Sequence, residues 1–302
     1  MNYFQLTEKF PTEEHVIQHF INLRYKGTPT CNHCSSVRVH RRGDKTKVFQ
    51  CYDCHNDFSI FKDTLMEDTS TDLRKWMYAI HLFLNGKKGI SGLQLKREIG
   101  VTYKTAWRML HKIRAAMGNP ARIENSFFPI VEIDETYVGG KPRKGNRFDT
   151  SQEQIKRGRG TKKTPVIGVV CRKTKQVYAK VALPNKQGKK LTGIQLLKVL
   201  DGAVKKKAIV MTDEFKGYNI LAKTKHYHAK VDHTKEYVRG FRHTNNIENF
   251  WSTLKRGIYG IYHAVSVKYL QRYVDEFCFR YNNRRNSDIF NLVLIQGIKS
   301  EL

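Results

Sequence analysis

Hydrophobic residues in the N-terminal third of the chain recur at steps of three and four, a spacing that predicts amphipathic helices. The clearest run begins near Thr71 and includes Leu73, Trp76 and Ile80. The same spacing predicts helices over residues 12–25, 71–84, 91–99 and 102–117. A short turn at Gly100 separates the last two of these helices. The pattern therefore predicts a helical N-terminal region that ends in a tightly connected helix pair.

Beyond a break at residues 118–120, the pattern changes to the alternation and short apolar runs that are typical of strands. The predicted strands cover residues 128–138, 165–171, 176–183 and 208–211. The predicted helices that follow or separate them cover residues 191–201, 244–258 and 266–284. Strands mixed with helices in this order predict an α/β domain with a mixed sheet.

The segment 141–163, between the first two predicted strands, has no apolar period and holds nine Lys or Arg residues against Asp149 and Glu153. We predict a flexible basic loop that becomes ordered on a nucleic acid backbone. A merely solvated insertion is the alternative interpretation.

The charge of the whole chain favours a polyanionic partner. Of 302 residues, 55 are Lys or Arg and 27 are Asp or Glu, which gives a formal net charge of +28. Hydrophobic residues make up 40%, enough to form real cores, which excludes a disordered basic tail. No apolar stretch approaches the roughly 18 residues that cross a bilayer, and the first ten residues lack a signal-peptide core. We expect a cytoplasmic protein that handles DNA or RNA and binds no membrane.

Four of the six cysteines form two close pairs, Cys31 with Cys34 and Cys51 with Cys54, separated by sixteen residues. Two such turns can direct four sulfurs to one tetrahedral ion, so the spacing predicts a structural Zn²⁺ site in a zinc ribbon. Disulfides would need an oxidising compartment, which nothing in the sequence indicates. Because so small a ribbon buries little surface, the metal is expected to hold it folded.

Two basic features of this region are candidate DNA contacts. In the helix pair, the second helix would present its first turn to a groove, as in a helix-turn-helix. The ribbon arginines form either a DNA contact or an ordinary solvated face. The candidate DNA-binding residues are Arg38, Arg41, Arg42, Thr102, Tyr103 and Lys104.

Three acidic residues occupy unusual positions for so basic a chain. Asp134 lies inside a strongly β-prone segment, and Asp213 directly follows an apolar strand, where ligands gather in open α/β sheets. Glu248 lies on the predicted helix 244–258, seven positions before Lys255, so the two side chains project in nearly the same direction. Each acid alone would be a cap, turn or salt-bridge residue; together they favour a metal site.

Three carboxylates suit a pair of Mg²⁺ ions, or Mn²⁺, because these hard cations prefer oxygen ligands. Two such ions stabilise the attacking and leaving oxygens of an in-line phosphoryl transfer. Hydrolysis of a phosphodiester and attack by a DNA 3′-OH use the same chemistry. The acids by themselves therefore do not separate a nuclease from a transposase.

The chain resembles bacterial insertion-sequence transposases that join an N-terminal zinc ribbon to a DDE catalytic domain of the ribonuclease-H-like fold. The resemblance covers roughly residues 10–290. It rests on the paired cysteines and on four segments: Ile133-Asp134-Glu-Thr-Tyr-Val-Gly-Gly-Lys141, Thr212-Asp213-Glu-Phe-Lys-Gly-Tyr218, Asn246-Ile-Glu248-Asn-Phe-Trp-Ser-Thr-Leu-Lys-Arg-Gly257 and Phe279-Arg-Tyr-Asn-Asn-Arg284.

The resemblance implies that Asp134, Asp213 and Glu248 are the catalytic, metal-binding triad. It also implies that Lys255 acts in catalysis by contacting DNA near the scissile phosphate, and we expect the adjacent Arg256 to contact DNA as well. Some relatives carry an asparagine in the third acidic role, so Asn245 and Asn246 are further candidates.

The leading hypothesis is a transposase that binds terminal inverted repeats in double-stranded DNA, cleaves the element ends and joins the 3′-OH to target DNA, as a homodimer or larger assembly. The alternatives are a nuclease that cuts without joining and a non-catalytic DNA-binding regulator. The expected parts are an N-terminal helical segment (1–27), the zinc ribbon (28–60), a helix-turn-helix domain (71–118) and a ribonuclease-H-like catalytic domain (127–290).

Overall fold

The computed structural model describes residues 1–43, 47–118, 123, 125–140, 163–184, 191–231 and 243–299. The chain divides into two compact units. Unit 1 contains residues 1–119 and 285–302, and unit 2 contains residues 120–284. Unit 1 is therefore built from both ends of the sequence. The basic segment 141–163 lies outside the described residues except for Lys163.

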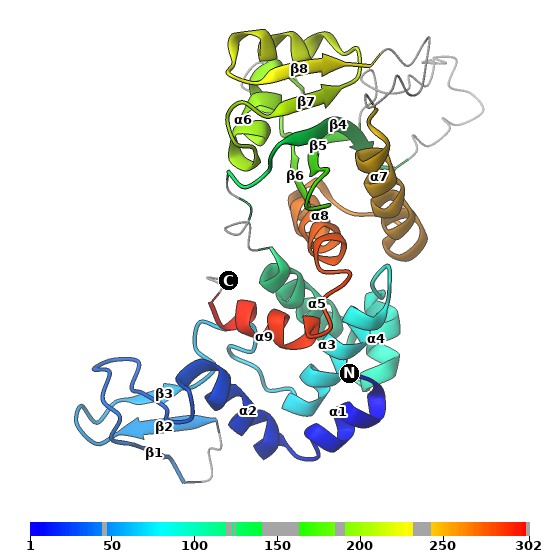
Figure 1. The fold of residues 1–302 in the computed structure, drawn as a ribbon. Coiled ribbons are helices and arrows are strands. Elements are labelled where there is room, and N and C mark those ends of the chain that lie inside the picture. The colour runs from blue at the N-terminus through cyan, green and yellow to red at the C-terminus, as the bar shows by residue number, and fades with distance from the viewer. Residues whose placement is uncertain are drawn as a thin grey trace. The chain divides into compact units, whose positions relative to one another are not determined.

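Unit 1 is mainly helical (Figure 1). Its helices are α1 (Tyr3–Lys9), α2 (Glu13–Tyr25), α3 (Leu73–Asn85), α4 (Gly92–Ile99), α5 (Tyr103–Met117) and α9 (Ile289–Lys299). The predicted helix at 12–25 is present, but Thr12 does not cap it with a hydrogen bond, since its hydroxyl contacts Nδ1 of His15 over 2.8 Å.

Helices α4 and α5 are joined by a turn of three residues in which Gly100 adopts a left-handed conformation with φ 60°. Each helix has a side-chain cap at its start. Ser91 accepts a hydrogen bond from the backbone N–H of Gln94, and Thr102 accepts one from that of Thr105, both over 3.1 Å. These caps fix both helix starts, as expected for serine and threonine at the N-cap.

A three-stranded antiparallel sheet lies between α2 and α3 in the sequence. Its strands are β1 (Val39–Arg41), β2 (Val48–Cys51) and β3 (Asp57–Ser59). Phe49 and Phe58 pair across β2 and β3 and are buried. The small sheet and the two cysteine turns beside it form the predicted zinc ribbon.

The chain returns to unit 1 through α9, which packs against α2, α3 and α5. The backbone N–H of Leu65 donates to the carbonyl of Gly297 over 2.9 Å. A Cβ added at Gly297 would lie 2.0 Å from Cδ2 of Leu65, so the helix approaches this loop as closely as a glycine permits. The last helix is therefore part of the N-terminal unit's core.

Unit 2 is built on a five-stranded sheet in the order β6-β5-β4-β7-β8. The strands are β4 (Ile130–Val138), β5 (Thr164–Cys171), β6 (Val177–Val181), β7 (Ile209–Thr212) and β8 (Tyr227–Lys230). β4, β5 and β6 pair antiparallel, while β4, β7 and β8 pair parallel. This mixed sheet with β4 at its centre confirms the predicted α/β domain with a mixed sheet.

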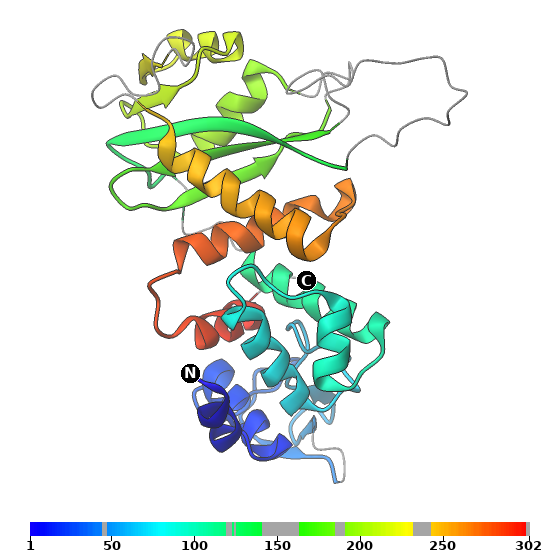
Figure 2. The same cartoon turned by 90° about the vertical axis from the view of Figure 1, so that its right-hand side faces the viewer.

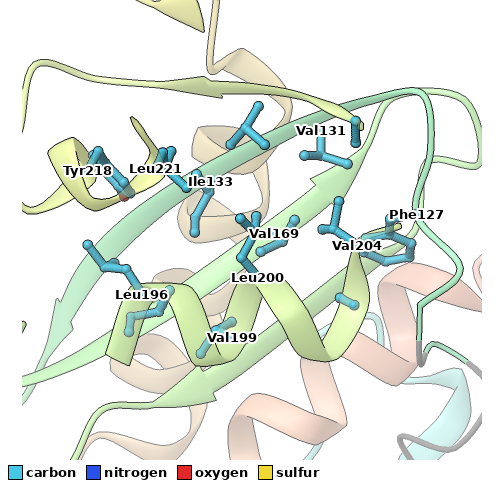
Figure 3. Close-up of a cluster of buried hydrophobic side chains, with 14 of the residues drawn as sticks. Phe127, Val131, Ile133, Val169, Leu196, Val199, Leu200, Val204, Tyr218 and Leu221 are labelled. Atoms are coloured by element: carbon cyan, nitrogen blue, oxygen red, sulfur yellow. The ribbon is translucent and has the colours of Figure 1, made fainter. Parts of the chain in front are cut away.

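Helices cover both faces of this sheet. One face packs on α6 (Gly193–Ala203) and the 3₁₀ helix η3 (Lys216–Lys223), through the cluster that Figure 3 shows. The other face packs on α7 (Asn245–Gly257) and α8 (Val267–Asn282), and Figure 2 shows α7 lying across the strands. A short π-helical turn, η4 (Ile258–Tyr262), links these two helices. Consecutive residues of β4 therefore face different helix layers.

No helix in the described parts of the chain combines the length and apolar character that spanning a membrane requires.

Candidate functional site

The four ribbon cysteines form the first candidate metal site. Their sulfurs all lie within 4.8 Å of one another, with 3.6 Å between Cys31 and Cys54 and 3.6 Å between Cys34 and Cys51. A hydrogen bond from the backbone N–H of Cys54 lowers the pKa of Cys51 to about 7. Four converging thiols without disulfides are the donor set of a structural Zn²⁺ site, as the spacing predicts.

The three ribbon arginines have acidic partners within the chain. Arg38 pairs with Asp53 over 2.8 Å, and Arg41 contacts both carboxylate oxygens of Glu14 at 2.6 and 2.5 Å. Arg42 pairs with the third partner, Asp57. The sequence is compatible with a DNA contact or a solvated face for these arginines, and the ion pairs add an intramolecular role that the sequence spacing does not reveal. Arg38 remains the most exposed, at 72% of its side chain.

The first turn of α5 presents the other candidate DNA contacts. Tyr103 is 49% exposed and Lys104 is exposed beside it. The hydroxyl of Thr102 caps the helix and also lies 2.9 Å from the Thr105 hydroxyl. Thr102 therefore serves as the N-cap of α5, while Tyr103 and Lys104 are exposed at the surface.

Asp134 is partly buried in the central strand β4, on the face that α7 covers. Its Oδ2 accepts a hydrogen bond of 3.1 Å from the indole N–H of Trp251 on α7. Burial, followed by the nearby charges of Glu135 and Asp213, raises the pKa of Asp134 to about 8. Such a shift is typical of carboxylates gathered at a functional site.

Asp213 immediately follows β7, which pairs parallel to β4. The register pairs Glu132 with Met211, and two further residues along each strand bring Asp213 level with Asp134. Oδ1 of Asp213 accepts the backbone N–H of Phe215 over 3.0 Å, which holds the turn that leaves the strand. The structure therefore brings the two aspartates together at neighbouring strands.

Glu248 and Lys255 lie on α7 on either side of Trp251. Glu248 is exposed, and its Oε1 accepts a hydrogen bond of 2.7 Å from the Thr244 hydroxyl. Burial lowers the pKa of Lys255, while the nearby charge of Asp134 raises it. The spacing of three and four residues puts Glu248, Trp251 and Lys255 along one side of the helix.

The acids are less tightly grouped than the cysteines. Among the described residues, the cysteine set is the one group of three or more His, Cys, Asp or Glu side chains whose ligand atoms lie close enough together to hold a metal ion. Arg256, exposed at the end of α7, donates its Nε to the carbonyl of Ser252 on its own helix over 3.1 Å. The structure thus places Asp134 near Asp213 and near Trp251 and Lys255 of α7. Glu248 lies one turn before Trp251 on the same helix.

Three residues of this region have contacts that the sequence did not predict. Glu132, two positions before Asp134, is fully buried against the start of α7. Trp251 was assigned to the apolar stripe alone, without its hydrogen bond to Asp134. Tyr218 donates its hydroxyl to Glu135 over 2.9 Å on the opposite face of the sheet. The signal for Glu132 was present, because residues two apart on a strand share a face.

The chain matches two family models. Residues 129–282 match the ISXO2-like transposase domain, and residues 11–57 match a transposase zinc-ribbon domain. An uncharacterized protein in the transposable element ISH50 of Halobacterium salinarum is 30% identical over 284 residues, which are 90% of this chain and 91% of that protein. An uncharacterized transposase-like protein of Haemophilus influenzae is 29% identical over 108 residues, 36% of this chain and 82% of that protein.

Solved structures show weaker similarity. The Mos1 strand transfer complex matches with a TM-score of 0.31 and 14% identity, covering 73% of this chain and 78% of that one. The simian T-cell lymphotropic virus intasome matches with a TM-score of 0.30 and 14% identity, covering 68% and 65%.

Proposed function

This chain belongs to the ISXO2-like transposase family, and we propose that it cleaves DNA at the ends of its element and joins the freed 3′-OH to target DNA. The observation that carries the proposal is the arrangement around Asp134. Asp213 lies level with it on the parallel neighbour strand, and Trp251 and Lys255 approach it from α7. Glu248, on the same side of α7, completes the proposed triad.

The donor set fits divalent ions that prefer oxygen. Asp134, Asp213 and Glu248 offer carboxylate oxygens only, and the raised pKa of Asp134 shows a carboxylate held in an environment that resists its negative charge. A nearby cation would relieve that resistance. A pair of ions does not require all three carboxylates on one metal, which is compatible with the wider spacing of Glu248.

When bound by these residues, two Mg²⁺ or Mn²⁺ ions supply charge stabilisation at the attacking and leaving oxygens of an in-line phosphoryl transfer. The protein's own groups orient the reaction. Trp251 fixes the Asp134 carboxylate, and Lys255 places a positive charge beside it where a phosphate of the bound strand would lie. The same site would serve hydrolysis by water and attack by a 3′-OH.

We propose that unit 1 recognises the element ends. The exposed Tyr103 and Lys104 at the start of α5 would enter a groove of double-stranded DNA, in the manner of a helix-turn-helix. Arg38, Arg41 and Arg42, each already paired with a carboxylate of this chain, are the proposed phosphate contacts of the ribbon. The excess of positive charge and the segment 141–163 would hold DNA backbones, so binding should weaken steeply with salt.

We propose four functional parts: the N-terminal helical segment (1–27), the ribbon (28–60), the helix pair (71–118) and the catalytic domain (127–290). Because two element ends must be joined, we propose a homodimer or larger assembly on DNA. Arg256 would add a backbone contact at the exposed end of α7.

The test is a strand-transfer assay with purified protein, an end-containing duplex and Mg²⁺. Joined products are expected from the wild type and from Asp201→Asn, which removes an exposed acid on α6. We expect Asp134→Asn, Asp213→Asn and Glu248→Gln each to lose joining by at least about 100-fold. Cleavage without joined products would favour the nuclease alternative, and wild-type joining by Asp213→Asn would reject the triad.

A further inference from the structure

One buried carboxylate of unit 2, outside the proposed triad, connects the central strand to helix α7. Glu132 lies on β4 two residues before Asp134, on the same face of the sheet, and its side chain is completely buried. A buried carboxylate is costly unless it is paired and hydrogen-bonded. Its contacts therefore show what the fold uses it for.

Both oxygens of Glu132 accept hydrogen bonds from the start of α7. Oε2 accepts the backbone N–H groups of Asn246 over 2.9 Å and Ile247 over 3.1 Å. Oε1 accepts the Asn246 side-chain amide over 2.6 Å and Nε of Arg172 over 2.7 Å. Nη2 of Arg172 in turn donates to the carbonyl of His243, just before the helix, over 2.6 Å.

Glu132 thus takes the place of an N-cap. The first N–H groups of a helix have no partner within it and carry a partial positive charge. At this helix the N-cap residue, Thr244, directs its hydroxyl to Glu248 instead. A carboxylate from the central strand satisfies the N–H groups, so the start of α7 is tied to β4 rather than capped locally.

A second hydrogen bond between α7 and β4 lies one turn further along the helix, where Trp251 donates to Asp134. Gly168 makes room for the indole: a Cβ at this position would lie 2.6 Å from a carbon of the Trp251 ring. Glu248 lies on α7 between the residues that contact Glu132 and the residue that contacts Asp134. The position of the Glu248 carboxylate relative to Asp134 therefore depends on both sets of hydrogen bonds.

We infer that Glu132 is a positioning residue that holds the start of α7, and with it Glu248, against the strand that carries Asp134. This inference rests on the proposed metal-binding triad. Glu132 is not itself a ligand, because four donors at 2.6 to 3.1 Å already occupy its two oxygens.

The experiment compares Glu132→Gln with Glu276→Gln in the full, zinc-loaded chain. Glu276 is a matched control: it is also completely buried, pairs with Arg280 over 2.9 Å and accepts the Tyr262 hydroxyl over 2.8 Å, but lies on α8 outside the proposed triad. The replacement at Glu132 puts an amide N–H₂ against existing donors. Mn²⁺ binding is measured by electron paramagnetic resonance of the free ion, and amide exchange is measured by mass spectrometry.

We expect Glu132→Gln to weaken Mn²⁺ binding by about 10- to 100-fold, the range for residues that orient metal ligands. Exchange at the amides of Asn246 and Ile247 should accelerate, and the Mg²⁺ concentration that half-saturates joining should rise in parallel with the loss of Mn²⁺ affinity. Glu276→Gln should keep its Mn²⁺ affinity within twofold of the wild type, even if it loses as much thermal stability as Glu132→Gln. Equal Mn²⁺ affinity in Glu132→Gln and wild type, or equal losses in the two variants, would overturn the inference.

Asp134→Asn separates this inference from the function on which it rests. If Asp134→Asn abolishes Mn²⁺ binding and Glu132→Gln leaves it intact, the positioning role alone fails. If Asp134→Asn binds Mn²⁺ like the wild type, the proposed triad fails and the positioning role with it. Should Glu132→Gln not fold, Arg172→Lys carries the test. This variant keeps the positive charge but cannot donate to both Glu132 and the His243 carbonyl. A loss of Mn²⁺ affinity of less than twofold would reject the inference.

Discussion

Trp251, on helix α7, donates its indole N–H to Oδ2 of Asp134, on strand β4, over 3.1 Å. The contact joins a residue of the apolar helix stripe to Asp134, whose pKa burial raises to about 8. It explains why the large ring at this position is a tryptophan: a phenylalanine would fill the core but offer no donor.

We predict that Trp251→Phe lowers strand joining by about 10- to 100-fold, because Asp134 loses the group that orients it. Single-turnover joining at saturating DNA measures the effect. The control is Trp76→Phe in unit 1, which also loses an indole hydrogen bond, the one of 2.8 Å to the Thr69 hydroxyl. Equal activity of both variants would show that the Trp251 bond has no role in orientation.

Gly168→Ala is expected to destabilise unit 2 by about 1–3 kcal/mol, because the new methyl group would overlap the Trp251 ring. The smaller ring in Trp251→Phe should remove much of this overlap. The double variant should therefore be about as stable as Trp251→Phe alone, a non-additive result typical of residues in contact. Thermal unfolding of the four proteins measures it, and additive losses would contradict the packing argument.

We predict one tightly bound Zn²⁺ per chain, held by the four ribbon cysteines. Cys51→Ser should lose it, and chelation should unfold the region 31–59, because so small a sheet depends on its metal. Colorimetric zinc release and hydrogen exchange measure these outcomes. Cys278→Ala is the control, since this buried cysteine lies in the core of unit 2 and should leave the zinc content unchanged.

Asp275 on α8 should make unit 2 less stable as the pH rises. Burial raises the pKa of Asp275 to about 6, against the opposing effects of Lys180 and Gln271. Because the folded-state pKa lies above the unfolded value of about 3.9, stability is full below about pH 4 and falls until about pH 6. The loss amounts to about 3 kcal/mol at 1.36 kcal/mol per pKa unit.

Asp275→Asn removes this penalty and keeps an oxygen for the 2.8 Å hydrogen bond from Gln271. The variant should have a higher Tm than the wild type at pH 7.5 and about the same Tm at pH 4.5. A difference in Tm that does not change with pH would show that Asp275 is not titrating in this range.

Truncation after Arg284 is expected to destabilise unit 1, although the deleted residues are at the opposite end of the sequence. Helix α9 packs on α2, α3 and α5, and its Gly297 carbonyl accepts the N–H of Leu65. Hydrogen exchange in residues 60–117 should accelerate, and binding to end DNA should fall, while Mn²⁺ binding by unit 2 is retained. Unchanged exchange in this region would reject the role of α9.

The helices and strands with strong apolar periods were predictable, and so was the ribbon, because four thiols at this spacing have few other uses. Strand β8 was missed because it is a short edge strand in which only Ala229 is buried, so its sequence lacks the alternation of a half-buried strand. The helix at 289–299 was not predicted, and its place in unit 1 was not either, since nothing in its sequence indicates the surface on which its apolar residues pack.

The sequence alone pointed to the three proposed triad acids, through the position of Asp134 inside a strand, of Asp213 after a strand and of Glu248 on an amphipathic helix, and through the family resemblance. What surrounds them was decided by the tertiary structure. The sequence treated Glu132 as one more residue of a strand, Trp251 as core and Arg38, Arg41 and Arg42 as a basic surface. Each of these roles is set by a partner from 15 to 117 positions away, because hydrogen bonds and ion pairs depend on which surfaces the fold brings together, whereas periodicity records only which side of each element is buried.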